Sequence, residues 1–210
     1  KHEILLIRQS KLKKKTPITV KKFLKVLKNK IFNIIFNKYS KKFSLDKKKA
    51  EEHLFKDYEF KIFEKYNIKL VNTEKNNSIN SLEYVNMIKS FHPDIIVVMG
   101  TSLLSNKIIE LAKYKILNLH TGLSPNYRGD LSNLWPIINN DYINSGVTIH
   151  ELDTGIDSGK IVFRKKVFSR EKDFPKVNCK AIVYGTFLMK KAVKNIIDSK
   201  HNSFKQESGG

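Results

Sequence analysis

The chain has 210 residues with 40 Lys and Arg against 20 Asp and Glu, which gives a formal net charge of +20. Hydrophobic residues make up 40% of the sequence, so the composition is that of a globular domain and excludes a disordered chain. This length is sufficient for one α/β domain with a sizeable core. The only cysteine is Cys179, which excludes an internal disulfide and a cysteine-based metal site.

Targeting signals are not evident in the sequence. No basic segment followed by an apolar one resembles a signal peptide, and no run approaches the ~18 apolar residues of a spanning helix. Together with the single cysteine, these features predict a cytoplasmic location and no membrane span.

The positive charge is concentrated at the front, since residues 1–66 carry +13 and the other 144 residues carry +7. A basic face would suit an anionic partner such as RNA, a membrane surface or the phosphates of a nucleotide sugar. The alternative is a compositional bias spread over solvated faces. We favour the bias, because Asn and Ile are in excess together with Lys.

The first third of the chain predicts a strand over residues 2–7 and a second one over 68–71. Between them, Thr16-Pro17 has the form of a helix start, and helical spacing of apolar residues continues to Tyr39. This amphipathic helix could bind a membrane or nucleic acid. We favour a cover for a sheet face, which an α/β sheet requires. A second helix is predicted from Ser44 or Asp46 to residue 65.

The middle of the chain alternates between helix and strand patterns. A helix over residues 81–91 is predicted to end before Pro93. Residues 94–100 form a continuous apolar run, which is typical of a central parallel strand buried on both faces. A helix over 106–114 and a strand beginning at Ile116 are predicted next.

The last part of the chain predicts strands over residues 147–152 and 160–168 and a long helix over 175–198. The tail over 199–210 is polar and is expected to fray. The whole pattern predicts an α/β fold with a mainly parallel twisted sheet flanked by helices. There is no Gly-x-Gly-x-x-Gly after a strand and no Walker loop, so dinucleotide and P-loop sites lack their signals.

The motifs that carry chemistry lie between Asn118 and Gly159. Asn118 and His120 stand at the end of an apolar strand, where open α/β folds place their functional groups. The following loop reads Leu123-Ser-Pro-Asn-Tyr-Arg-Gly129, and Asp157-Ser-Gly159 lies about one strand later. Each piece alone is a weak signal, whereas the combination is specific.

Together these pieces resemble the formyltransferases that use 10-formyltetrahydrofolate. That family has an Asn-x-His at a strand end, a Leu-x-Pro-x-x-x-Gly loop and an Asp-x-Gly, and the resemblance covers about residues 93–168. It implies a Rossmann-like formyltransferase catalytic domain over residues 1–198, followed by the polar tail. The family's sheet usually opens with one more strand and helix, so the front of the domain is expected to be missing or replaced.

The resemblance implies that Asn118, His120 and Asp157 are catalytic. Asn118 and His120 are two residues apart on an extended chain, so their side chains point to the same side. Asn118 and a protonated His120 would donate to the formyl oxygen as negative charge develops there, usually the largest catalytic contribution. Asp157 would favour the charged imidazole and accept the proton of the amine.

Three alternatives concern neighbouring residues. Asp153 is a rival of Asp157, but only Asp157 is followed by x-Gly as in the family. His150 lies in a predicted strand and is interpreted as structural. A zinc site from His120, His150 and acidic residues is disfavoured because no close ligand pair accompanies them. No metal is therefore expected.

By resemblance, two short loops hold the folate, one after the apolar strand and one before Asp157. Their residues are Ser102, Leu103, Leu104, Thr154, Gly155 and Ile156. Residues near the reaction centre are assigned to the amine substrate, and these are Tyr127, Arg128 and Trp135. For Trp135 a place in the core remains an alternative.

The family uses three kinds of acceptor: methionyl-tRNA, glycinamide ribonucleotide and nucleotide-linked amino sugars. The tRNA branch normally adds a C-terminal barrel, and little chain follows the last predicted helix. The variant His120-Thr-Gly-Leu-Ser-Pro, with Leu134-Trp-Pro behind it, looks most like the sugar N-formyltransferases. We therefore expect a nucleotide-linked acceptor, such as a dTDP-4-amino-4,6-dideoxy sugar made for surface polysaccharide.

Partner predictions follow from this choice. The donor is expected to be 10-formyltetrahydrofolate, a nucleic acid partner is not expected, and a homodimer is left open. An alternative from another functional class is a non-catalytic relative whose basic front binds RNA or a membrane.

Overall fold

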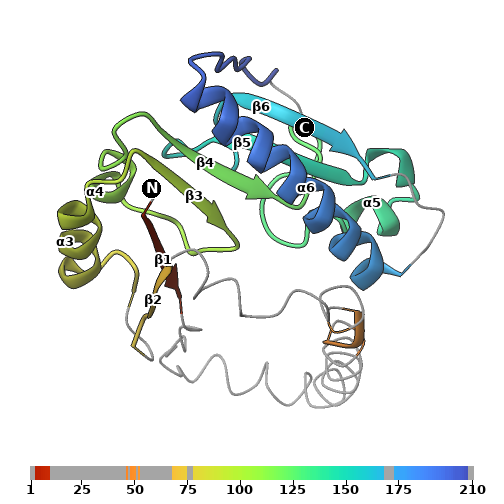
Figure 1. The fold of residues 1–210 in the computed structure, drawn as a ribbon. Coiled ribbons are helices and arrows are strands. Elements are labelled where there is room, and N and C mark those ends of the chain that lie inside the picture. Colours follow the sequence, from red (N-terminus) through yellow and green to blue (C-terminus); the bar gives the residue numbers. More distant parts are fainter. Residues whose placement is uncertain are drawn as a thin grey trace, which may run out of the picture.

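The computed structural model describes residues 3–9, 46, 48–50, 52, 68–74, 78–167 and 173–207. The helices predicted over 16–39 and 44–65 fall outside these ranges, apart from 46, 48–50 and 52, which are helical. Figure 1 shows two groups of strands with helices around them. Strands β1 (Ile4–Arg8) and β2 (Ile68–Asn72) form a parallel pair.

The larger sheet has the order β3-β4-β5-β6. Its strands are β3 (Ile95–Met99), β4 (Lys115–His120), β5 (Gly146–Glu151) and β6 (Ile161–Lys166). Strands β3 and β4 are parallel, whereas β5 runs antiparallel to both of its neighbours.

The predicted α/β architecture is confirmed, but the described sheet is mixed and not mainly parallel. The connection from β5 to β6 explains part of this difference. A parallel pair needs a crossover of about a dozen or more residues, usually a helix. The loop over residues 152–160 is too short for one, so β6 must return antiparallel to β5.

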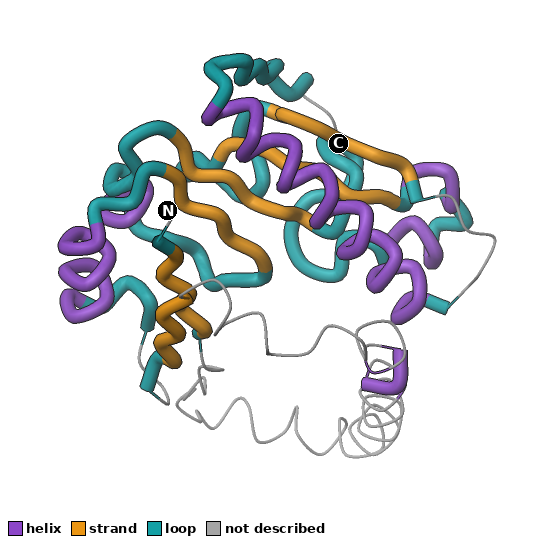
Figure 2. The backbone as a smooth tube through the Cα atoms, in the orientation of Figure 1, coloured by secondary structure: helices purple, strands orange, loops and turns teal. Residues whose placement is uncertain are grey.

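Helix α6 (Phe174–Ile197) lies across one face of the larger sheet, where Figure 2 shows it running over the strands. The side chain of Asp173 caps its first turn by accepting a hydrogen bond from the N–H of Lys176, and Pro175 occupies the first turn. Cys179, on the same helix, is buried. The core between helix and sheet consists of Leu117, Leu119, Val147, Ile149, Val162, Val167, Ala181, Met189 and Ala192.

Gly185 permits the close approach of α6 to the sheet. A Cβ atom at this position would lie 2.8 Å from a methyl carbon of Val147 and 2.9 Å from Cγ of Leu119. Both distances are below those of ordinary packing, so the helix could not lie as close with a larger residue. The first turns of α6 lie beside the carboxyl ends of β3 and β4.

A second core joins the two groups of strands. Helices α3 (Leu82–Phe91) and α4 (Asn106–Ile109) contribute Tyr84, Ile88 and Ile108, against which Ile7 of β1 and Ile96 of β3 pack. Helix α3 is terminated by its C-cap His92, whose φ of 49° is left-handed, directly before Pro93. Helix α4 is shorter than the predicted span of 106–114.

Strand β3 differs from its prediction. Burial on both faces was expected from its apolar sequence, but Val97 and Met99 are 48% and 50% exposed. The reason is the position of the strand, because β3 is the outer strand of the larger sheet and α6 packs mainly on β4, β5 and β6. The side chain of Met99 consequently lines a cavity.

The polar tail also differs from its prediction, since residues 199–207 are docked and not frayed. Phe204 and Ile161 exchange two backbone hydrogen bonds, of 2.8 and 2.9 Å. His201 and Ser203 each donate to Oε1 of Glu151 over 2.8 Å. The prediction of a frayed tail rested on its polar composition. It was wrong because these polar residues form hydrogen bonds with the edge of the domain.

The segment between β4 and β5 contains α5 (Trp135–Ile138) and the 3-10 helix η1 (Tyr142–Asn144).

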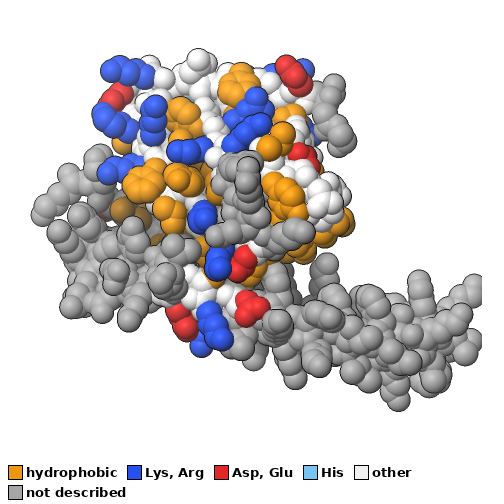
Figure 3. Space-filling view, turned by 90° about the vertical axis from the view of Figure 1, so that its right-hand side faces the viewer, with side chains coloured by type: hydrophobic (Ala, Val, Ile, Leu, Met, Phe, Trp, Pro, Cys, Tyr) orange, Lys and Arg blue, Asp and Glu red, His pale blue; other side chains and the backbone are white. Residues whose placement is uncertain are grey.

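On the face drawn in Figure 3, Lys and Arg side chains are interspersed with hydrophobic ones. In the described part of the chain, no helix has both the length and the apolar run that crossing a bilayer requires.

Candidate active site

A cavity of about 790 Å³ opens at the carboxyl ends of β3 and β4. This volume lies within the range of about 300–1,000 Å³ that is usual for ligand sites. The walls are the loop after β3, the end of β4, the loop before Asp157 and the first turns of α6. From α6 come Phe174, Asn178 and Ile182, which sequence reasoning did not assign to a site.

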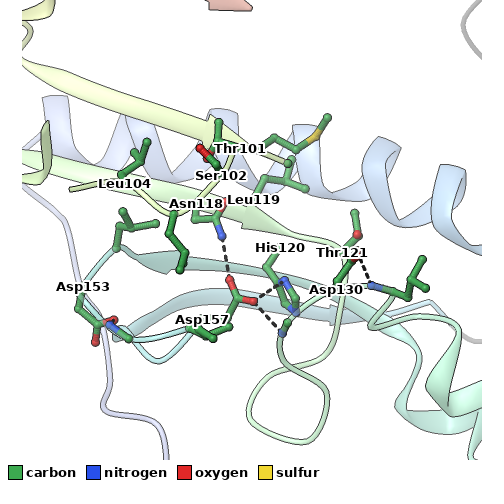
Figure 4. A pocket seen from close by; sticks show the side chains of 18 of the residues that line it. Thr101, Ser102, Leu104, Asn118, Leu119, His120, Thr121, Asp130, Asp153 and Asp157 are labelled. Atoms are coloured by element: carbon green, nitrogen blue, oxygen red, sulfur yellow. Dashed lines mark hydrogen bonds and ion pairs between the residues drawn. The ribbon is translucent and has the colours of Figure 1, made fainter. Parts of the chain in front are cut away.

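Asn118, His120 and Asp157 all line this cavity. Asn118 and His120 come from β4, and Asp157 comes from the loop between β5 and β6, with its carboxylate turned toward them in Figure 4. Nδ2 of Asn118 donates to Oδ1 of Asp157 over 3.1 Å. Nδ1 of His120 lies 3.2 Å from Oδ2 of Asp157. The structure therefore brings the three predicted side chains into one network.

Two glycines of the sequence motifs place the carboxylate. Gly129 has a φ of 81°, which favours glycine, and its N–H donates to Oδ2 of Asp157 over 2.9 Å. Gly159 lies so close to the backbone of β5 that a Cβ atom would overlap the carbonyl oxygen of Glu151. The glycines of both motifs thus allow two loops to meet at Asp157.

His150 also belongs to the network, although its position in a strand favoured a purely structural interpretation. It is 1% exposed, and its Nε2 lies 3.1 Å from Nδ2 of Asn118 and 3.3 Å from Oδ1 of Asp157. Strand pairing is the feature that could have indicated this role of His150, because His150 lies directly opposite Asn118 in the antiparallel β4–β5 ladder.

The protons of His150 can be partly assigned from its partners. Its Nδ1 lies 2.7 Å from the carbonyl oxygen of Glu151, which only accepts hydrogen bonds, so Nδ1 carries a proton. Nε2 then faces both the amide of Asn118 and the carboxylate of Asp157. His150 therefore couples the amide of Asn118 to the carboxylate of Asp157.

The pKa values of His120 and Asp157 are both shifted downward. Burial lowers the pKa of His120, and the charge of Asp157 and the carbonyl of Tyr127 counter this only in part. Burial alone would raise the pKa of Asp157, but the hydrogen bond from His150, the charge of His120 and the N–H of Gly129 outweigh it. The charged imidazole expected from sequence is thus disfavoured, because desolvation exceeds the attraction of the carboxylate.

The His120–Asp157 pair is arranged to take up one proton. Nε2 of His120 lies 2.9 Å from the carbonyl oxygen of Tyr127, so Nε2 carries the proton of the neutral ring. The lone pair of Nδ1 then faces Oδ2 of Asp157. One added proton would convert this contact into a hydrogen-bonded ion pair.

The six residues predicted to hold the folate all line the same cavity, namely Ser102, Leu103, Leu104, Thr154, Gly155 and Ile156. Leu103 and Ile156 are exposed apolar side chains on two different loops, a surface that a flat heterocyclic ring could cover. Ser102 is tied to the end of β1, since its N–H and hydroxyl both contact Oε1 of Gln9. These residues fit a pterin-containing donor in size and character.

The three residues assigned to the amine substrate do not line the cavity. The hydroxyl of Tyr127 donates to Asp141, and the guanidinium of Arg128 contacts Gln206. Trp135 begins α5 and is 50% exposed, so its alternative assignment to the core is wrong. These residues were assigned to the substrate because they lie in or near the motif loop in sequence, and this proximity did not place their side chains in the cavity.

Asp153 has a local role. Its Oδ1 accepts hydrogen bonds from the N–H of Gly155 and the hydroxyl of Ser158, over 3.1 and 2.7 Å. Figure 4 shows its side chain apart from the Asp157 cluster. Across the described ranges, no group of three or more His, Cys, Asp or Glu is placed to hold a metal ion.

Residues 14–174 match the protein family described as Formyl transferase. The chain belongs to this family. The formyltransferase chain is 32% identical over 154 residues to the methionyl-tRNA formyltransferase of Halothermothrix orenii, covering 72% of this chain and 48% of that relative. It is 36% identical over 95 residues to the GDP-perosamine N-formyltransferase of Brucella melitensis, covering 45% and 36% respectively. The formyltransferase chain thus spans about half the length, or less, of these two relatives.

Solved structures confirm the fold. A formyltransferase from Anoxybacillus kamchatkensis, in complex with UDP-4,6-dideoxy-4-formamido-L-AltNAc and tetrahydrofolate, has a TM-score of 0.57 at 20% identity, covering 100% of this chain and 84% of that one. A 4-N formyltransferase from Francisella tularensis has a TM-score of 0.55 at 25% identity, covering 76% and 60%. Glycinamide ribonucleotide transformylase 1 from Symbiobacterium toebii has a TM-score of 0.59 at 14% identity, covering 70% and 74%.

Proposed function

We propose that this chain transfers a formyl group from 10-formyltetrahydrofolate to the amine of a nucleotide-linked amino sugar. The observation that carries the reaction is the carboxylate of Asp157, which accepts from Asn118 and pairs with His120 on the wall of one cavity. Membership of the formyl transferase family supports the same reaction.

The donor supplies one activated formyl group, and the loops over 102–104 and 154–156 hold it in the cavity. Transfer forms a bond between the amine nitrogen and the formyl carbon and breaks the bond between that carbon and the folate nitrogen. The amine loses one proton, and the leaving nitrogen gains one. The site must therefore hold one proton for a short time, beside a formyl oxygen on which negative charge develops.

The His120–Asp157 pair takes up this proton. In its resting state the pair has a neutral imidazole and an ionised carboxylate, and protonation of Nδ1 produces the ion pair for which its 3.2 Å spacing is suited. The positive imidazolium then stabilises the charge on the formyl oxygen. The same proton is available to the leaving nitrogen, so the pair acts first as base and then as acid.

Asn118 donates an N–H to the developing charge. Its Nδ2 lies 3.1 Å from both Oδ1 of Asp157 and Nε2 of His150, and these two atoms are only 3.3 Å apart. One N–H can therefore face both of them, and the other is available for the formyl oxygen, where a single such donor contributes about 10²–10³ in rate.

The choice of acceptor has support from two kinds of comparison. The Brucella relative is a GDP-perosamine N-formyltransferase, and the Anoxybacillus structure holds a UDP-linked formamido sugar. Methionyl-tRNA is the second candidate acceptor. It is favoured by the Halothermothrix relative, whose similarity extends over 72% of this chain.

A formyl-transfer screen tests the proposal. The wild-type chain is offered 10-formyltetrahydrofolate with dTDP- and GDP-linked amino sugars, glycinamide ribonucleotide and methionyl-tRNA, and formylated product is measured by mass spectrometry. We expect product with an amino sugar, and a loss of at least about 10² in kcat for His120→Ala and for Asp157→Asn. Asp94→Asn is the matched control, because that exposed carboxylate lies at the opposite end of β3.

Two results would change the proposal. Product with methionyl-tRNA alone would replace the acceptor and keep the reaction. Near-wild-type kcat in folded His120→Ala and Asp157→Asn would show that the site is assigned to the wrong residues. Calorimetric titration with 5-formyltetrahydrofolate separates an enzyme from a non-catalytic RNA- or membrane-binding relative, which would not bind the folate.

A further inference from the structure

Gln206, in the docked tail, joins two loops of the candidate active site. Its Nε2 donates to the carbonyl oxygens of Asp157 and Gly159, over 2.8 and 2.6 Å. Its Oε1 accepts from Nε and from a terminal nitrogen of Arg128, over 3.0 and 2.8 Å. One amide side chain thus holds the loop that carries Asp157 and the motif loop that carries Arg128.

The tail around Gln206 is itself anchored. Phe204 is paired with Ile161 through two backbone hydrogen bonds, and the Arg164 guanidinium lies over the Phe204 ring at 5.9 Å. Upstream, His201 and Ser203 both donate to Glu151, which also binds Lys115. These contacts hold residues 201–204 against the domain, so the position of the Gln206 side-chain amide is restrained.

The backbone conformation of Asp157 requires restraint by neighbouring residues. Its φ of 48° is left-handed, an uncommon and strained conformation for a residue that is not glycine. Such a conformation persists only where the surroundings enforce it. Gln206 contacts the carbonyl oxygen of this residue and that of Gly159, two positions later, and so restrains the backbone on both sides of Ser158.

We propose that Gln206 is a positioning residue that holds the Asp157 carboxylate in register with Asn118 and His120. It acts through the backbone and touches no reacting atom, and its kinetic effect rests on the proposed function. A displacement of about 1 Å in a reacting group can cost about 10² in rate. Gln206 and Arg128 form one clamp on the Asp157 loop, because the guanidinium of Arg128 donates two hydrogen bonds to Oε1 of Gln206 and so fixes the orientation of its amide.

The kinetic test compares Gln206→Ala with Lys205→Ala, a matched control for the exposed side chain next to it. We expect kcat to fall at least about tenfold in Gln206→Ala, with KM for the folate changed less than threefold, and both to be unchanged in Lys205→Ala. Gln206→Glu should also lower kcat, because it keeps the contact with Arg128 but sets a carboxylate against two carbonyl oxygens. Unchanged kcat in folded Gln206→Ala would overturn the proposal.

A double-mutant comparison separates positioning from general stability. In an Asp157→Asn background, Gln206→Ala should lower kcat no further, since the group that it positions is already gone. The same fold loss in both backgrounds would overturn a role through Asp157. If Gln206→Ala does not fold, Arg128→Lys supplies the test, because it breaks the two-point contact and leaves the tail sequence intact.

Amide hydrogen exchange tests the clamp without any substrate. We expect exchange over residues 153–159 to be at least about tenfold faster in Gln206→Ala than in wild type, and unchanged in Lys205→Ala. Equal exchange in Gln206→Ala and wild type would overturn the clamp. Faster exchange in a chain whose wild type formylates no tested amine would support the clamp and reject the proposed function, so the two failures are distinguishable.

Discussion

Nδ1 of His120 lies 3.2 Å from Oδ2 of Asp157, although strand β5 separates the two residues along the chain. Both pKa values lie below their ordinary values, that of His120 because of burial and that of Asp157 because its hydrogen bonds and neighbouring charge outweigh burial. The resting pair is therefore neutral imidazole with ionised carboxylate near pH 7. This state has a measurable consequence for the pH dependence of the reaction.

We expect kcat/KM to be level near neutral pH and to fall in acid, with a midpoint below the ordinary histidine pKa of 6.5. Protonation of His120 in the free protein removes the acceptor for the amine proton. Asp157→Asn should move the titration of His120 to still lower pH, because the charge that raises its pKa is gone. Proton NMR of the His120 ring measures this pKa without substrate. A wild-type midpoint above 6.5 would contradict the prediction.

Gly122 controls the orientation of His120. A Cβ atom at this position would overlap Nε2 of His120 and Cβ of Ser132, and would lie 2.7 Å from the carbonyl oxygen of Tyr127, which is the hydrogen-bond partner of that Nε2. We expect Gly122→Ala to lower kcat at least about tenfold, because relief of these overlaps displaces the imidazole from its hydrogen bond. Asn126→Ala, exposed in the same loop, is the control. Equal kcat in a folded Gly122→Ala would show that the ring is not held by this contact.

Gly185→Ala should destabilise the domain although it replaces a glycine within a helix. Alanine gains about 0.5–1 kcal/mol from helix propensity, but overpacking against Val147 and Leu119 costs about 1–3 kcal/mol. We therefore expect a net loss of about 1 kcal/mol in the free energy of unfolding, measured by urea denaturation. Thr186→Ala, at an exposed position of α6, should cost less than about 0.5 kcal/mol. A stabilised Gly185→Ala would mean that α6 can shift outward without loss.

Glu151 should make the docked tail sensitive to acid. Burial alone would raise its pKa, but hydrogen bonds from His201, Ser203 and Lys115 lower it from 4.5 to about 2. A depressed pKa contributes stability that is present above pH 4.5 and is lost as the pH falls toward 2. We expect residues 199–207 to become protease-sensitive within this window. Glu151→Gln should weaken the dependence, and a tail equally protected at pH 2 and pH 6 would contradict it.

The sequence was most informative where a residue pattern is compatible with only one kind of local structure. Continuous apolar runs predicted β3 and β4, and the glycines in the two motifs indicated loops. The convergence of Asn118, His120 and Asp157 was expected from their places after two strand ends, but β5 runs antiparallel to β4. The loop after β5 must therefore carry Asp157 back along the sheet to reach Asn118 and His120. The apolar loops over 102–104 and 154–156 line the same cavity.

Features that depend on long-range pairing were not predictable in the same way. His150 entered the network through its register opposite Asn118, which one strand alone does not reveal. The tail was expected to fray because the partners of Gln206 lie on loops far away in the sequence. Trp135 and Arg128 lie in or near the motif in sequence, but neither lines the cavity, and Arg128 contacts Gln206 instead.

The buried position of Cys179 gives the domain an internal reporter of folding. It is the only thiol in the sequence, and it is buried on α6. Alkylating reagents can reach it only when its surroundings open, so the labelling rate measures local opening around α6. A cysteine introduced on the surface would react much faster than Cys179. Dyes could then be attached at one chosen position without removing the native residue.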